Sequence, residues 1–273
     1  MNYGIDESDP TVQKAINWIL SKQNENGAIT AGTYYTYDTS LAILALVSTG
    51  NMDYYDEIKD AVNYLINVQN DEDTAYTSDN PYYGGWSYAS WRPNWADLSN
   101  TQFALLALHY AESMEKDDII VPSDVWEKAE IFITRCQNRE ISNPDYNFYN
   151  DGGFIYMPGS TIFAGGQSYA SMTTAGLWGL YTCGVSKSDG RVIDAWNWIR
   201  NHYYTDRNYP IGSTFLYYYL YGLSKAAQLW GIAQIEGHDW YEEISEFLIN
   251  KQEGDGHWIG TDSHEEPDLV ATC

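Results

Sequence analysis

Two kinds of apolar segment alternate along the chain. In the first kind, the apolar residues are three or four positions apart, as Ile16, Ile19 and Leu20 are within residues 14–29, and this spacing predicts an amphipathic helix. The second kind, such as residues 41–47, is apolar almost all round and contains small residues that allow close helix packing. We expect the amphipathic helices to form an outer ring and the apolar helices an inner ring around a central cavity.

Each pair of segments belongs to a longer repeat. A basic residue, a helical stretch with an aromatic residue, a Gln and a Gly-rich turn come before the apolar helix. One copy, VIDAWNWIRNHYY, lacks both the Gln and the Gly-x-Trp turn. Recurrence of one pattern at this spacing predicts a helical repeat protein. We expect a single domain over residues 1–273, built from helical hairpins at about 10–50, 57–114, 124–184, 190–231 and 239–273.

The Gln and Trp residues of the repeat have a structural interpretation. A helix end leaves backbone groups without partners, and a Gln amide carries donors and an acceptor that can satisfy them. An indole packs well over a hairpin. We therefore expect these side chains to act as structural staples: Gln23, Gln69, Trp86, Gln137, Gln252 and Trp258.

The repeat resembles the QW-type repeat of the squalene/oxidosqualene cyclase and protein prenyltransferase superfamily. The order of basic residue, small residue, aromatic residue, Leu or Ile, Gln and Gly-x-Trp is the same. The resemblance covers essentially the whole chain. It implies an all-α fold, an α/α toroid, with an apolar central chamber and with the toroid left incomplete at Cys273, where the last inner helix stops short.

The resemblance also locates a family motif. Class II terpene cyclases carry Asp-x-Asp-Asp at the start of an inner helix, and the middle Asp protonates an alkene, which requires an acid held in its protonated form by burial and a neighbouring carboxylate. The matching segment here reads Asp97-Leu98-Ser99-Asn100. Ser99 replaces the proton donor and Asn100 its partner, so we expect no catalysis by that route.

Other polar residues align at the starts of the inner helices. Asp97, Asp38 and Asp268 are the candidate catalytic acids, with helix capping as the alternative, since Asp at a helix start accepts bonds from free N–H groups. Abundant aromatic residues can stabilise carbocations or stack on sugars. The residues expected to line a ligand chamber are Ser99, Asn100, Tyr169, Met172, Tyr217 and Tyr218.

Metal ligands do not occur in a recognisable pattern. The sequence contains no Asp-Asp-x-x-Asp, and the segment comparable to the zinc site of protein prenyltransferases, residues 211–221, has neither Asp nor Cys. Cys136, Cys183 and Cys273 form no Cys-x-x-Cys pair, and His264 lacks identifiable partner ligands. We predict no metal and no cofactor.

The charge restricts the partners. With 38 Asp and Glu against 14 Lys and Arg, the net charge is −24, which repels phosphate backbones and anionic lipids. We expect no nucleic-acid partner. The start of the sequence lacks a signal-peptide pattern, and no stretch is apolar enough to span a membrane. These features predict a soluble protein. The sequence as given favours a cytoplasmic location, and a fragment of a longer chain would allow an extracellular one.

Three functions fit these observations. The first is a cyclase-like or prenyltransferase-like domain that binds an isoprenoid or another apolar ligand, and any activity would then be terpene cyclase-like or transferase-like. The second is a non-catalytic scaffold that meets a protein partner through the acidic insertion at residues 71–83. The third is a carbohydrate-active α/α-barrel enzyme with paired carboxylates.

Overall fold

The computed structural model describes residues 7–89, 94–114, 118–263, 265 and 268–272. Within these ranges the regular structure is helical, with isolated β-bridges and no strand. The all-α prediction is therefore confirmed. His264 and Cys273 lie outside the described residues. The chain divides into two compact units, Met1–Phe132 and Ile133–Cys273, and the boundary falls inside helix α5. The single domain expected over residues 1–273 stays a prediction.

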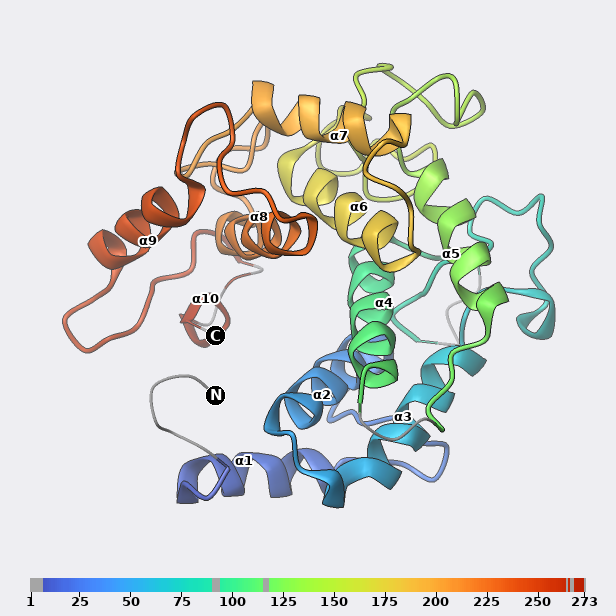
Figure 1. Cartoon of the computed structure of the whole chain (residues 1–273), viewed down its shortest axis with the longest axis vertical. Helices are drawn as coiled ribbons and strands as arrows, with labels where there is room; N and C mark the ends of the chain where they lie inside the picture. Colours follow the sequence, from blue (N-terminus) through green and yellow to red (C-terminus); the bar gives the residue numbers. More distant parts are fainter. Residues whose placement is uncertain (1–6, 90–93, 115–117, 264, 266–267, 273) are drawn as a thin grey trace. The chain divides into compact units, whose positions relative to one another are not determined.

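The first unit holds two complete hairpins and most of α5. Helices α2 and α4 pack side by side, and α3 packs against both (Figure 1). The helices are α1 (Pro10–Leu20), α2 (Tyr35–Thr49), α3 (Tyr55–Asn67), α4 (Leu98–Glu112) and α5 (Ser123–Arg135), and short 3-10 turns lie at η1 (Met52–Tyr54) and η2 (Glu72–Thr74).

The second unit repeats this arrangement. Helix α6 packs against α8 and against α7, and α8 contacts α9 (Figure 1). The helices are α6 (Ala170–Thr182), α7 (Gly190–Asn201), α8 (Leu216–Trp230), α9 (Trp240–Lys251) and the short α10 (Asp268–Thr272). In both units, α1, α3, α5, α7 and α9 are the first helices of hairpins and the even-numbered helices are the second.

Burial separates α4 and α6 from α3 as the apolar pattern predicts, whereas α2 leaves Leu41 45% exposed. The second helices α4 and α6 are buried over nearly their whole length. The first helix α3 buries one face, with Ile58, Val62 and Leu65 at 0 to 2% exposure. A helix that is apolar all round needs neighbours on every side, whereas an amphipathic helix needs them on one.

One hydrogen-bond pattern joins each of the first three hairpins to the next. The amide Nε2 of Gln69 donates to Gly84 O at 2.9 Å, in its own turn, and to Val125 O at 3.0 Å, in the first turn of α5. Gln137 repeats this with Gly152 O and Arg191 O, both at 2.8 Å. The amide of Gln23 likewise reaches the first turn of α3 at Glu57 O, over 2.8 Å.

The indole of the turn forms a second bond of the same kind. Trp86 Nε1 donates to Leu65 O at 2.8 Å, and Trp258 Nε1 donates to Leu248 O at 2.7 Å. Each acceptor lies four residues before the Gln of its own hairpin. The indole therefore ties the turn back to its first helix, while the Gln reaches forward to the next one.

The turn glycine is needed because the next helix lies so close. Gly84 has φ +85°, and a Cβ there would stand 1.8 Å from Lys128 O of α5. Gly27 makes the same approach to Asp60 O of α3, where a Cβ would stand at 2.3 Å. A side chain at Gly84 would force the two hairpins apart, so the glycine sets the spacing between them.

Candidate functional site

The start of α4 is built around Asp97. Its Oδ1 accepts from Asn100 N at 2.8 Å, which is the N-cap bond, and its Oδ2 accepts from Asn100 Nδ2 at 2.9 Å and Trp95 Nε1 at 3.0 Å. Asp97 is fully buried. Both carboxylate oxygens are thus acceptors for N–H groups, which is the geometry of a helix cap.

Ser99 and Asn100 occupy the two positions where the resemblance places the proton donor and its partner. Ser99 Oγ lies 2.9 Å from the hydroxyl of Tyr37, in the first turn of α2. Asn100 is fully buried, and its Oδ1 accepts no hydrogen bond from the described residues. The structure thus joins the starts of α2 and α4 through neutral groups.

The other two candidate acids lie in different surroundings. Asp38 is in the first turn of α2, and its Oδ2 accepts from Thr30 Oγ1 at 2.6 Å. Asp268 begins α10, and its Oδ1 accepts from Gly260 N at 3.1 Å. His257 Nε2 stands 3.6 Å from Asp268 Oδ2, and the pKa of His257 is raised by its hydrogen bond to Asp255 and by nearby carboxylates.

At the start of α6, the cap comes from a distant residue. Tyr169 occupies the N-cap position without a side-chain cap bond. Instead, Asn208 Oδ1 accepts from Ser171 N at 2.9 Å, and Asn208 Nδ2 donates to Ser171 Oγ at 2.9 Å and to Thr214 O at 3.0 Å. Asn208 is fully buried. One amide therefore joins the start of α6 to the loop before α8.

The start of α8 is capped in the same way, by carboxylates. Glu265 Oε1 accepts from Tyr217 N at 2.7 Å and from Tyr218 N at 3.2 Å, and Asp262 Oδ2 accepts from Phe215 N at 2.5 Å. Burial and the charge of Glu265 raise the pKa of Tyr217. Tyr217 and Tyr218 therefore meet the buried Glu265 through their backbone, and their rings are half-buried.

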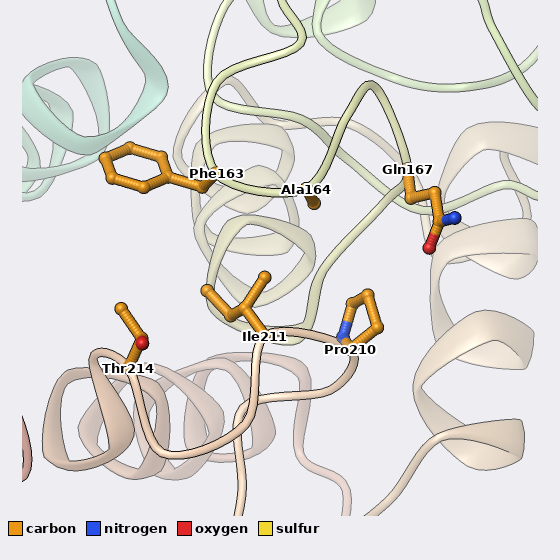
Figure 2. A pocket seen from close by; sticks show the side chains of 6 residues that line it. All are labelled: Phe163, Ala164, Gln167, Pro210, Ile211 and Thr214. Atoms are coloured by element: carbon orange, nitrogen blue, oxygen red, sulfur yellow. The ribbon is translucent and has the colours of Figure 1, made fainter.

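A pocket opens beside these starts in the second unit. Its volume is about 490 Å³, and it lies between the loop before α6 and the loop before α8 (Figure 2). Ile211 points towards Ala164 from the opposite loop, and Phe163 and Gln167 flank Ala164 (Figure 2). The lining residues are Phe163, Ala164, Gln167, Pro210, Ile211 and Thr214.

Three aromatic rings pack against one of the lining residues. Phe163 packs edge-on against Tyr156, Tyr169 and Phe215, with ring centroids 5.2 to 6.3 Å apart. Tyr169, expected to line a ligand chamber, thus contacts Phe163 but is not itself among the lining residues. The six lining residues include no Asp, Glu, His, Cys, Lys or Arg. Four of the six lining residues are apolar, and the remaining two, Gln167 and Thr214, are uncharged.

A sequence model of squalene-hopene cyclase C-terminal domains matches residues 1–140, just over half of the chain's 273 residues. The match covers α1 to α5 and the turns that hold Gln23, Gln69 and Trp86. The chain belongs to this family. Its helical hairpins are those of the α/α toroid class, as the QW-type repeat indicates, and the squalene cyclase-like prediction is confirmed.

This cyclase-family chain contains a column of threonines that sequence reasoning missed. Thr101 Oγ1 accepts from Trp86 N at 3.1 Å, and Thr173 Oγ1 accepts from Phe154 N at 3.1 Å. Thr39 and Thr272 do the same for Ile29 and Trp258. Thr101 and Thr173 lie three residues after the first residue of their helices, and Thr39 and Thr272 lie four residues after it. A search for Thr in the first turn or just after it in each second helix would therefore have found the column.

The fourth hairpin replaces its Gln with a tyrosine, which sequence reasoning also missed. Tyr203 occupies the Gln position, and its hydroxyl donates to Glu243 Oε2 of α9 at 3.1 Å. Burial and Glu243 raise the pKa of Tyr203 well above its ordinary range. The spacing of twelve residues from Arg191 to Tyr203, equal to that from Val125 to Gln137, is the signal in the sequence.

The acidic insertion is tied to the fold at one end. Lys128 forms salt bridges with Asp71 at 3.0 Å, Glu72 at 3.7 Å and Asp124 at 2.8 Å. Burial opposes the charge of Lys128, but Asp124 and Asp71 outweigh this effect and raise the pKa of Lys128. Asp71 and Glu72 therefore anchor the insertion to α5.

Two further observations concern metals and membranes. Among the described residues, no three His, Cys, Asp or Glu side chains gather closely enough to hold a metal ion. No helix in those residues combines the length and hydropathy that crossing a bilayer requires.

Proposed function

We propose that this chain is a cyclase-family domain that binds a neutral apolar ligand of the isoprenoid class and does not catalyse by the Asp-x-Asp-Asp route. The observation that carries the proposal is the pocket between the loops before α6 and α8. Its wall is formed largely by Phe163, Ala164, Pro210 and Ile211, with only Gln167 and Thr214 polar. An isoprenoid buries hydrocarbon and needs few hydrogen bonds, which matches this lining.

The absence of a proton donor at the family position supports the second half of the proposal. Protonating an alkene requires a carboxylic acid held neutral. Ser99 and Asn100 cannot supply one, and the oxygens of Asp97 are both occupied as acceptors. Ligand binding without this chemistry is what the residues support.

The pocket lining also bears on the carbohydrate alternative. Glycoside hydrolysis needs a pair of carboxyl groups facing the scissile bond. The six residues that line the pocket include neither Asp nor Glu. This composition favours an apolar ligand over a sugar.

A thermal-shift panel tests the proposal. Squalene, farnesol and a longer polyprenol are each added to the purified chain, and a ligand that binds the folded state alone raises the melting temperature. Ile211→Glu places a charge in the pocket and is expected to abolish the shift. Ile141→Glu is the matched control, because Ile141 is 87% exposed and is not among the lining residues.

The outcomes separate clearly. A shift with at least one isoprenoid, lost in Ile211→Glu and kept in Ile141→Glu, supports the proposal. No shift with any of the three ligands would overturn it. Equal shifts in both variants would place the ligand elsewhere and would overturn the assignment to this pocket.

A further inference from the structure

Two of the six residues that line the pocket carry uncharged polar groups. Gln167 comes from the loop before α6 and Thr214 from the loop before α8, and the two lie on opposite sides of Ile211 (Figure 2). In the part of the chain that the structure describes, neither the Gln167 amide nor the Thr214 hydroxyl forms a hydrogen bond. Both groups are therefore available to a ligand.

The two groups differ in their exposure to water. Gln167 is exposed, whereas Thr214 is half-buried. Water competes for a hydrogen bond at an exposed amide, and a hydrogen bond in a partly buried place is electrostatically stronger. A ligand therefore gains more from a hydrogen bond with Thr214, whose hydroxyl can both donate and accept.

The backbone at Thr214 is held in place by hydrogen bonds from other parts of the chain. Asn208 is fully buried, and its Nδ2 donates to Thr214 O at 3.0 Å. One residue earlier, Ser213 O accepts from Thr261 Oγ1 at 2.7 Å. Thr214 is thus fixed well enough to position a hydroxyl group of a ligand.

The first amides of α8, directly after Thr214, already have acceptors. A helix N-terminus can bind a phosphate group through its N–H donors. Here Tyr217 N and Tyr218 N donate to Glu265 Oε1 at 2.7 and 3.2 Å, and Leu216 N donates to a loop carbonyl at 3.1 Å. The buried carboxylate of Glu265 therefore takes the place that a phosphate would need.

The start of α6 on the other side of the pocket is filled in a similar way. Ala170 N donates to Tyr209 O at 2.9 Å. Ser171 N donates to Asn208 Oδ1 at 2.9 Å. These two amides are engaged within the fold, so they do not serve a diphosphate either.

The charges around the pocket also disfavour an anion. Arg207, in the loop before α8, donates from Nε and Nη2 to the two carboxylate oxygens of Asp206, at 2.8 and 3.0 Å. Asp262 accepts from Phe215 N, so it adds a second carboxylate to that of Glu265 at the start of α8. A diphosphate would meet like charges here, whereas an alcohol would not.

We propose that the pocket selects an isoprenoid alcohol, whose hydroxyl group is hydrogen-bonded by Thr214, over the corresponding diphosphate and the corresponding hydrocarbon. This inference rests on the function proposed above and names the end group of its ligand. The hydrocarbon part lies against Ala164, Pro210 and Ile211. A hydrocarbon without the hydroxyl fills the same space but forgoes the hydrogen bond with Thr214.

Displacement of tritiated farnesol from the purified chain tests this selection. The competitors are unlabelled farnesol, farnesene and farnesyl diphosphate, the last with and without Mg²⁺. Farnesol is expected to bind about three- to tenfold more tightly than farnesene, which is the ratio that one net hydrogen bond supplies. Farnesyl diphosphate is expected to bind at least about tenfold more weakly than farnesol, because like charges oppose it.

Thr214→Val tests the residue itself. Valine has nearly the same shape but no hydroxyl, so the preference for farnesol over farnesene is expected to disappear while farnesene still binds. Retained binding of farnesene also shows that the variant is folded. Ser213→Ala is the matched control, because it removes an exposed hydroxyl one residue away that is not part of the lining and leaves Ser213 O in place as an acceptor. It should keep the preference.

The outcomes separate this inference from the proposed function. Equal affinities for farnesol and farnesene in the wild type, or a diphosphate that binds as tightly as farnesol, would overturn the inference alone, since an isoprenoid would still bind. Loss of the preference in Gln167→Leu together with its retention in Thr214→Val would overturn the assignment to Thr214. A wild type that binds no farnesol and no farnesene would overturn the proposed function and this inference with it.

Discussion

The side-chain amide of Gln69 donates to the backbone carbonyl of Val125, 3.0 Å away in the first turn of the next first helix. The two residues are 56 positions apart in sequence. The bond joins one hairpin to the next, and Gln23 and Gln137 form bonds of the same kind. The staple role expected for these residues is a prediction that mutation can test.

Gln69→Leu is expected to lower the free energy of unfolding by about 1 to 3 kcal/mol. Leucine fills the space but cannot donate to Gly84 O and Val125 O in a fully buried place. Urea unfolding measures the change. Gln228→Leu, on the exposed side of α8, is the control and should change stability by less than about 0.5 kcal/mol. Equal effects of the two substitutions would contradict a staple at Gln69.

Gly84→Ala tests the close approach of the turn to α5. The Cβ would stand 1.8 Å from Lys128 O, so backbone must move, and we expect a loss above about 3 kcal/mol or failure to fold. Gly237→Ala is a matched control, since Gly237 has the same φ of +85° and an added Cβ there meets nothing within 4 Å. Its cost should be the conformational strain alone, about 1 to 2 kcal/mol. Thermal unfolding measures the loss of stability in both variants. Equal losses would contradict the close packing of Gly84 against α5.

Tyr203 is expected to make the free energy of unfolding depend on pH in the alkaline range. Its pKa is raised in the folded chain by burial and by Glu243, whereas an unfolded Tyr loses its proton near pH 10. The contribution of Tyr203 to the free energy of unfolding is therefore fully present below about pH 10, and it is lost as the pH rises above that value. Tyr203→Phe should flatten this fall in the free energy of unfolding between about pH 9 and 11. Tyr241→Phe, at a residue 67% exposed, should leave it unchanged, and identical curves for all three proteins would count against the assignment.

Asp97→Asn separates capping from catalysis. The amide would turn an N–H donor towards the donors of Trp95 or Asn100, so we expect a loss of about 1 to 3 kcal/mol in the free energy of unfolding. Asp38→Asn keeps an acceptor for Thr30 and should cost less than about 1 kcal/mol. Denaturant titration checks both. If Asp97→Asn were as stable as the wild type but removed an activity on glycans, the capping account would fail and Asp97 would be a catalytic acid.

The helices and their order were predictable because the signal is periodic. Apolar spacing and the recurring Gln indicate both kinds of helix, and the resemblance to the cyclase repeat identified the family. The fourth hairpin was harder, because Tyr203 replaces the Gln and because α8 begins only at Leu216, after the loop that carries Asn208. A motif search does not find a substitution that changes the residue type and replaces the bond to a backbone carbonyl with one to the Glu243 carboxylate.

The site was less predictable because its hydrogen bonds join distant residues. Asn208 caps α6 across 37 positions, and Glu265 caps α8 across 48. No local pattern marks a residue that caps a helix in another hairpin. The pocket likewise arises from two loops that meet only in the folded chain, so Phe163 and Ile211 carry no signal of their own.

Native mass spectrometry of the purified chain with farnesol tests the central claim most directly. The account predicts one ligand retained by the wild type and by Ile141→Glu, and none by Ile211→Glu, because Ile211 lines the pocket and Ile141 does not. Failure of the wild type to retain farnesol, squalene or a longer polyprenol, or undiminished retention by Ile211→Glu, would contradict it.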